Sequence, residues 1–222
     1  MWRLDDDAIV EGRPIRARVY ERKSDISPDG RWLIYAAYGR GPDLPFHGDG
    51  YTAISRPPGL KADFFAPMGS TWFGGGVFDA EGRLALRLEI DARERDMIDR
   101  AGIPTTAWPP DDIASPSSNE RAFDNIHWRL IRDGWRQADG GYEKPFAGGV
   151  LRKVLNERTE RHELSHTLAP SAPQPASWEW AEVFGNELLF AAHGAVYRAQ
   201  DGEPPRKVAA FEAARREPRT KG

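Results

Sequence analysis

The feature that most constrains the fold is a tight turn followed at once by an apolar run. The turn spans Ser27–Gly30 and reads SPDG. Proline presets φ, aspartate bonds to its own backbone, and glycine accepts the positive φ that other residues resist. The run that follows, Trp32–Ala37, is apolar at every position and predicts a buried strand. The segment therefore indicates a β-rich architecture and points to no particular reaction.

Further β-prone runs follow along the chain. The run after Tyr51 is stopped by Pro57–Gly59, because consecutive prolines cannot continue a sheet ladder. Alternation of Leu84, Leu86 and Leu88 indicates a half-buried strand. The predicted strands, with the hairpin around Gly185–Asn186, are Ile15–Glu21, Arg31–Tyr38, Tyr51–Arg56, Asp63–Ala66, Gly76–Asp79, Val183–Phe184, Leu188–Ala192 and Ala195–Arg198.

Only one segment predicts a helix. It is Asp91–Ala101, with Asp91 as a candidate cap and with Gly102 and Pro104 ending it. The helix is short and highly charged, so a solvated surface insertion is favoured over a partner-binding helix. The stretch Pro104–Asn125 is rich in proline, serine and aspartate, which predicts a long loop, either a lid or a disordered segment.

Turn-like tetrapeptides recur with their centres at residues 30, 82, 134 and 186, a constant step of 52 residues. That step is close to the ~50-residue blade of kelch-type β-propellers. The sequence therefore predicts an all-β fold, a small irregular β-propeller-like array of about four to five antiparallel blades with one short helix. We expect a single domain over residues 1–211 and a disordered basic tail over residues 212–222.

Charge and composition exclude several classes of function. The 222 residues include 31 basic and 34 acidic ones, and this near balance argues against a nucleic-acid partner. No window holds the ~18 consecutive apolar residues of a membrane helix, and Met1–Asp7 lacks the pattern of a signal peptide, so a cytoplasmic protein without a membrane partner is expected. The absence of cysteine excludes disulfides, thiolate nucleophiles and cysteine-based metal sites.

The segment His162–His166 matches the zincin pattern H-E-x-x-H. On a helix, His162 and His166 would share one face for zinc, and Glu163 would be the general base. The polar flanks and the even spacing of the histidines with Leu164 favour a strand instead. A coincidental match without a cofactor is therefore favoured, and a zinc-dependent hydrolase is the alternative.

Two aromatic and glycine-rich patterns have both a packing and a binding interpretation. Gly74–Gly76 indicates a bulge or a close backbone approach, with Trp72 beside it as a candidate pocket residue. Trp178 and Trp180 are expected on one face of a strand, where core packing is favoured over sugar binding. A carbohydrate-active hydrolase with a tryptophan-lined pocket and paired carboxylates is the second form of the hydrolase alternative.

Three blocks of the sequence resemble an uncharacterised family of small bacterial proteins. They are Tyr20–Gly30, Tyr51–Pro58 and Thr71–Phe78, and Trp178–Arg198 is similar to the family's tryptophan-rich C-terminal hairpins. Tyr51 stands where the family pattern has tryptophan, and the chain begins later than the related proteins. The resemblance implies a bacterial, intracellular, propeller-like protein, and it carries no assigned activity or site residue.

The sequence favours a non-enzymatic binding or scaffold protein that engages a protein or a small ligand. The contact surface would be one end of the strands or the loop Pro104–Asn125. Polar residues in or beside the distinctive blocks are the first candidates, although turn and strand hydrogen bonding would also explain them. The candidate binding residues are Arg22, Asp25, Thr52, Ser55, Arg56 and Trp72.

Overall fold

The computed structural model describes residues 1–12, 15, 17–39, 50–68, 74–107, 125–146, 149–156, 161–166, 178–200 and 203–211. The chain forms two compact units, Met1–Gly134 and Trp135–Gly222, where the sequence predicts one domain over residues 1–211. Each unit is described by itself. Within the described residues, neither helix is long and apolar enough to cross a membrane.

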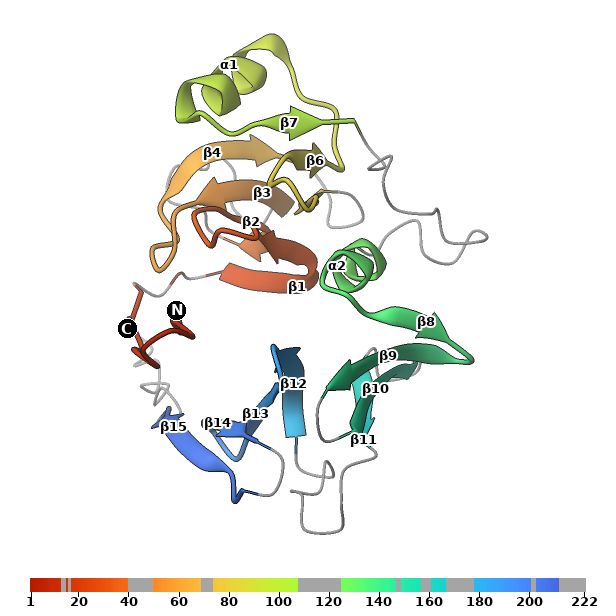
Figure 1. The fold of residues 1–222 in the computed structure, drawn as a ribbon. Coiled ribbons are helices and arrows are strands. Elements are labelled where there is room, and N and C mark those ends of the chain that lie inside the picture. The colour runs from red at the N-terminus through yellow and green to blue at the C-terminus, as the bar shows by residue number, and fades with distance from the viewer. Residues whose placement is uncertain are drawn as a thin grey trace, which may run out of the picture. The chain divides into compact units, whose positions relative to one another are not determined.

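The all-β class is confirmed, because four sheets make up most of the described chain (Figure 1). Unit 1 holds two of them. The first sheet joins β1 (Ala17–Ile26), β2 (Leu33–Gly39), β3 (Gly50–Ser55) and β4 (Ala62–Pro67), in that spatial order and all antiparallel. The second joins β5 (Gly76–Phe78), β6 (Leu84–Leu86) and β7 (Thr105–Thr106).

Unit 2 holds two antiparallel four-stranded sheets. One joins β8 (Arg136–Ala138), β9 (Gly141–Phe146), β10 (Gly149–Asn156) and β11 (Arg161–His166). The other joins β12 (Trp178–Phe184), β13 (Glu187–Ala192), β14 (Ala195–Ala199) and β15 (Arg206–Ala210). In each sheet of the chain, spatial neighbours are also neighbours in sequence, which keeps every pairing local.

The opening turn forms as predicted and joins β1 to β2. The N–H of Gly30 donates to the carbonyl of Ser27 at 2.8 Å, and Gly30 has φ 70°. The carboxylate of Asp29 accepts the hydroxyl of Ser27 at 2.6 Å and the N–H of Arg31 at 3.0 Å. These bonds, that from Ser27 first, lower the pKa of Asp29. The following strand is buried as expected, with Ile34 and Ala37 fully enclosed.

The prediction of a hairpin turn every 52 residues is wrong at the third position, residue 134. Gly30, Gly82 and Gly185 each have a positive φ and join the first two strands of a sheet. Gly134 has φ 84°, but it follows a helix instead of joining two strands. The corresponding turn, between β8 and β9, lies at Gly140. A helix that the sequence did not reveal occupies the expected hairpin position.

The chain has two helices in its described part, where the sequence predicts one. The expected helix is confirmed as α1 (Ala92–Ala101), with a capping box between Asp91 and Glu94 and with Gly102 at φ 72°. The second, α2 (Ile126–Arg132), has only seven residues, and its side chains Ile126, Trp128 and Leu130 are buried. Tertiary packing stabilises so short a helix, and a periodicity argument cannot detect it.

The core of unit 1 lies on both faces of the first sheet. On one face, Ile34, Ile54 and Phe64 pack with Leu84 of β6 and Ile98 of α1. On the other face the cluster consists of Tyr35, Ala37, Tyr51 and Ala53. Because Leu84 and Ile98 are fully buried in the first cluster, β6 and α1 are held rigidly against the sheet. This arrangement positions the pocket described next.

Candidate binding pocket

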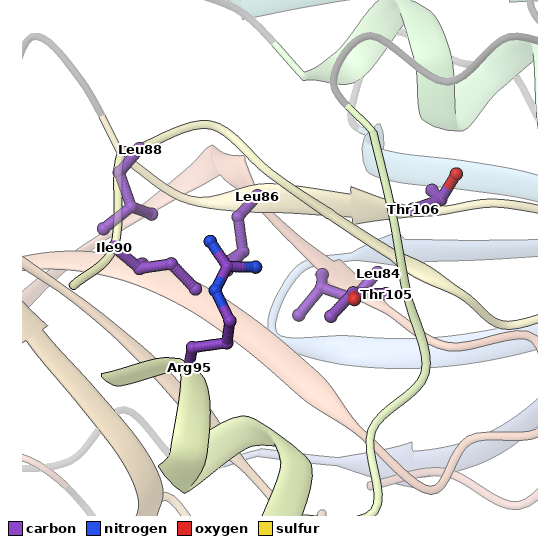
Figure 2. A pocket seen from close by; sticks show the side chains of 7 residues that line it. All are labelled: Leu84, Leu86, Leu88, Ile90, Arg95, Thr105 and Thr106. Atoms are coloured by element: carbon purple, nitrogen blue, oxygen red, sulfur yellow. The ribbon is translucent and has the colours of Figure 1, made fainter. Parts of the chain in front are cut away.

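A pocket of about 150 Å³ lies between α1, β6 and β7 in unit 1 (Figure 2). Most of its lining is aliphatic, with one cationic side chain and two threonines. The lining residues are Leu84, Leu86, Leu88, Ile90, Arg95, Thr105 and Thr106. The pocket is therefore a solvent-open hollow that combines aliphatic side chains with two hydroxyl groups and one positive charge.

The walls of the pocket form one β-α-β crossover. β7 runs parallel to β6, with Leu84 opposite Thr105, and parallel neighbours need a connection of this kind. The N–H of Leu84 donates to the carbonyl of Pro104 at 2.7 Å, which fixes the return of the chain. Most residues of α1 are exposed, as expected for a solvated surface insertion, and the helix also connects β6 to β7. Its buried residue Ile98 ties it to the core.

The alternation that predicted a strand continues past the end of β6. β6 stops at Leu86, yet Leu88 and Ile90 remain half-buried against the core and complete the aliphatic wall. Asp91 then caps α1, so the wall leads directly into the helix that carries Arg95. Apolar residues repeating at every second position up to a helix cap were the sequence signal for this pocket, which motif searching missed.

The guanidinium of Arg95 points into the middle of the pocket, among Leu84, Leu86 and Ile90 (Figure 2). Asp91 and Asp99 lie four residues before and after it, a spacing that suits ion pairs on a helix. On the same helix, Arg100 pairs with Asp96 at 2.7 Å. Arg95 makes no side-chain ion pair or hydrogen bond with any residue that the structure describes. Arg95 is an exposed residue, so its guanidinium reaches the hollow while remaining accessible to water.

Asp25, one of the predicted binding residues, is fully buried and structural. Its carboxylate contacts the guanidinium of Arg132 at 2.5 and 3.1 Å and accepts the N–H of Phe78 at 2.8 Å. The side chain of Arg132 is only 6% exposed. Burial raises the pKa of Asp25, an effect that the Arg132 charge opposes. The pair joins β1, β5 and α2 within unit 1.

Thr52 is also buried and holds a close backbone approach. Its hydroxyl accepts the N–H of Gly75 at 2.7 Å. A Cβ on Gly75, which has φ 74°, would lie 2.0 Å from the carbonyl oxygen of Lys23. The glycines therefore mark a close approach of two backbones, as the sequence indicates. This geometry leaves no room for a phosphate at Gly75.

The remaining predicted binding residues are not gathered into one site. Arg22 is half-buried on β1, and its carbonyl accepts the N–H of Asn125 at 3.2 Å. Ser55 is fully buried, and its hydroxyl has no partner among the described residues. Arg56 is exposed, lies over the ring of Trp32 at 4.5 Å and approaches Asp63 at 3.6 Å. Trp72 and most of the loop Pro104–Asn125 lie outside the described residues.

The H-E-x-x-H segment forms strand β11, so the strand interpretation is confirmed. His162 pairs with Leu155 and His166 pairs with Leu151 in the antiparallel ladder with β10. Residues four apart on a strand are separated by about 13 Å, whereas a helix would place them one turn apart. Among the described side chains, no group of three or more metal-ligating residues lies together.

The two indoles of the Trp178–Trp180 segment do not share a face, which corrects the prediction. A bulge shifts the register, so Trp178 pairs with Ala192 and Trp180 pairs with Ala191. Consecutive partners point to opposite faces. Trp178 stacks on Phe190 with ring centroids 4.6 Å apart, while Trp180 is 42% exposed. The stacked pair of indoles expected for sugar binding is not formed.

A buried charge cluster joins the two sheets of unit 2. The carboxylate of Glu182 on β12 accepts Lys144 and Lys153, each at 3.1 Å, and the indole N–H of Trp135 at 2.9 Å. The ammonium of Lys153 lies 4.0 Å from the centre of the Trp135 ring. The carboxylate of Glu182 therefore balances two largely buried ammonium groups. Its removal should destabilise unit 2.

The Glu182→Gln variant is expected to lower the free energy of unfolding by about 2 kcal/mol, because Lys144 and Lys153 each lose the carboxylate that they contact at 3.1 Å while remaining largely enclosed. Urea denaturation measures the loss. Glu179→Gln, on an exposed residue of the same strand, is the matched control and should change stability by less than about 0.5 kcal/mol. Equal effects of the two substitutions would contradict the role of Glu182.

Comparisons of the chain with family models, curated proteins and solved structures found no match.

Proposed function

We propose that this chain is a non-enzymatic binding protein and that the pocket between α1, β6 and β7 is its ligand site. One observation carries the proposal. The guanidinium of Arg95, an exposed residue, lies beside four aliphatic side chains of the hollow and forms no ion pair with Asp91 or Asp99. Small-molecule sites are typically apolar concavities with a few polar groups that fix the orientation of the ligand. A hollow of this size suits a small ligand with an aliphatic part.

The composition of the lining favours binding over catalysis. General acids, bases and nucleophiles are mostly histidine, carboxylate, cysteine, lysine or activated hydroxyl groups. The described lining offers the guanidinium of Arg95 and the hydroxyls of Thr105 and Thr106, and its other residues are leucine and isoleucine. Within the described part of the lining, no carboxylate, histidine or lysine lies ready to activate either threonine. The chemistry that this set supports is recognition.

The hydrolase alternative has less geometric support. Its zinc form needs His162 and His166 on one turn of a helix, and both lie on strand β11. Its carbohydrate form needs neighbouring indoles on one face, and Trp178 and Trp180 lie on opposite faces of β12. Neither form has a specific observation in its favour.

We also propose that the four sheets are blades of a small, irregular β-propeller. The support is that three sheets are four-stranded antiparallel meanders of consecutive strands, and that each first hairpin turns at a glycine with positive φ. Small-angle X-ray scattering tests this arrangement. A compact array of 222 residues predicts a radius of gyration of about 17 Å. A clearly larger value, as for two units on a flexible connection, would contradict it.

Titration with 1-hexanol tests the pocket as a ligand site. We expect the methyl resonances of Leu84, Leu86 and Ile90 to shift in a saturable way, because a cavity of this volume accepts about six carbon atoms. Methyl-selective NMR spectroscopy reports each side chain separately.

The methyl groups of Leu33 and Leu60, which pack against the opposite core cluster, are the internal control and should not move. The Leu86→Trp variant fills the hollow and should abolish the response. Shifts that are absent, or equally large at the control methyls, would remove the pocket as the ligand site.

A further inference from the structure

We infer that the pocket selects a short-chain aliphatic monocarboxylate, with its carboxylate on the guanidinium of Arg95 and its tail among the leucines. The inference rests on the proposed function, since it names the class of ligand for the same pocket. It follows from the charge of Arg95, from the volume of the hollow and from the chemistry of its walls.

The head group follows from Arg95. A guanidinium presents its donors in a planar fork that matches the two oxygens of a carboxylate. In the structure this fork lies among Leu84, Leu86 and Ile90, and because Arg95 is an exposed residue, water also reaches its donors and a bound carboxylate would replace that water. Because Arg95 is the only charged residue among the described residues of the lining, a monoanion balances the site. A phosphate monoester would bring a second negative charge with no cation to meet it.

The tail follows from the walls. Leu84, Leu86, Leu88 and Ile90 supply aliphatic surface without aromatic rings, which suits a flexible methylene chain. A volume of about 150 Å³ corresponds to a group of about six carbon atoms. Affinity should therefore rise by about fourfold for each methylene from butanoate to hexanoate. It should level off for octanoate, whose tail exceeds the hollow.

The decisive experiment compares hexanoate with 1-hexanol, which have tails of equal length and differ in charge. Dissociation constants are measured at pH 7 from the shifts of the pocket methyl groups. We expect hexanoate to bind about tenfold more tightly, as a charge-assisted bidentate contact requires. In Arg95→Gln the preference should disappear while hexanol binds as before, which also shows that the pocket is intact. Arg93→Gln, on an exposed arginine of α1 outside the lining, is the matched control and should keep the preference.

The possible failures separate the two claims. Equal affinity for hexanoate and hexanol, or a hexanoate preference that survives Arg95→Gln, overturns the carboxylate inference and leaves the pocket as an apolar site. Failure of both compounds to shift the pocket methyl groups overturns the proposed function together with the inference. An affinity that keeps rising through octanoate overturns the assignment of chain length.

Discussion

The Asp25→Asn variant is expected to lose about 3 kcal/mol of unfolding free energy, because it leaves the Arg132 guanidinium buried without its bidentate partner. The Arg132→Met variant should lose a similar amount by stranding the carboxylate. Removing both charges together should cost much less than the sum of the single losses. Urea denaturation of the four proteins of this double-mutant cycle measures the coupling.

The exposed pair of Arg100 and Asp96 on α1 provides the control for this cycle. Its side chains are 68% and 62% exposed, so Asp96→Asn should change stability by less than about 1 kcal/mol. If the losses at Asp25 and Arg132 simply add, the buried ion pair does not couple β1 to α2.

The same pair makes a prediction about pH. Burial raises the pKa of Asp25 above its usual 3.8, and the Arg132 charge limits that rise. Arg132→Met removes this opposing charge, so the pKa of Asp25 in the folded state moves higher. Below pH 3.8 the carboxyl is neutral in both folded and unfolded states, and its contribution to stability is fully present. This contribution of Asp25 to stability is lost as the pH rises through the pKa that Asp25 has in the folded state. The deficit of Arg132→Met relative to the parent protein should therefore be larger at pH 7 than at pH 4, and the double variant should not show this trend.

The Gly75→Ala variant is expected to destabilise unit 1 by about 3 kcal/mol or more. The new Cβ would lie 2.0 Å from the carbonyl oxygen of Lys23, and the residue would also keep a left-handed φ of 74°. Gly82→Ala isolates the second effect. Gly82 has φ 78° with no atom within 4 Å of the added carbon, so its loss should be about 1 kcal/mol.

Denaturation of both glycine variants with guanidinium chloride measures the difference between their free energies of unfolding. If both variants lose the same free energy of unfolding, the close approach between β1 and the Gly75 backbone does not constrain residue 75. The hydrogen bond between Thr52 and Gly75 would then not be evidence of a tightly packed site.

Local features of this fold were predictable from the sequence. The turn at Ser27–Gly30 depends on residues that fix their own backbone, and α1 begins and ends at Asp91 and Gly102 because capping is local. The apolar run that became β2 was predicted to be buried, since consecutive apolar residues leave no polar face for water.

Features that depend on distant partners were not predictable. Asp25 meets Arg132 across 107 residues, and nothing near either residue signals the other. α2 is too short to show periodicity, and its place against β1 is set by Asn125 and Arg129, whose side chains donate to the carbonyls of Lys23 and Ser24. The bulge beside Trp180 reverses the face of one indole, which alternation cannot anticipate.

The pocket was only partly predictable from the sequence. Its wall was visible as alternating leucines, and its helix was visible from its caps. The crossover that brings Thr105 beside Leu84 was not, because parallel pairing carries no local signal. Because the crossover was not predicted, Arg95 was expected to lie on a solvated helix and not beside a pocket.

The central claim is that the pocket between α1, β6 and β7 binds a short aliphatic acid through Arg95. A crystal structure of the full chain with 5-bromopentanoate, in which bromine replaces the terminal methyl group of hexanoate, tests it most directly. The account predicts an anomalous bromine peak among Leu84, Leu86 and Ile90, with the carboxylate within about 3 Å of the Arg95 guanidinium. An acid that binds elsewhere while this pocket stays empty would contradict it.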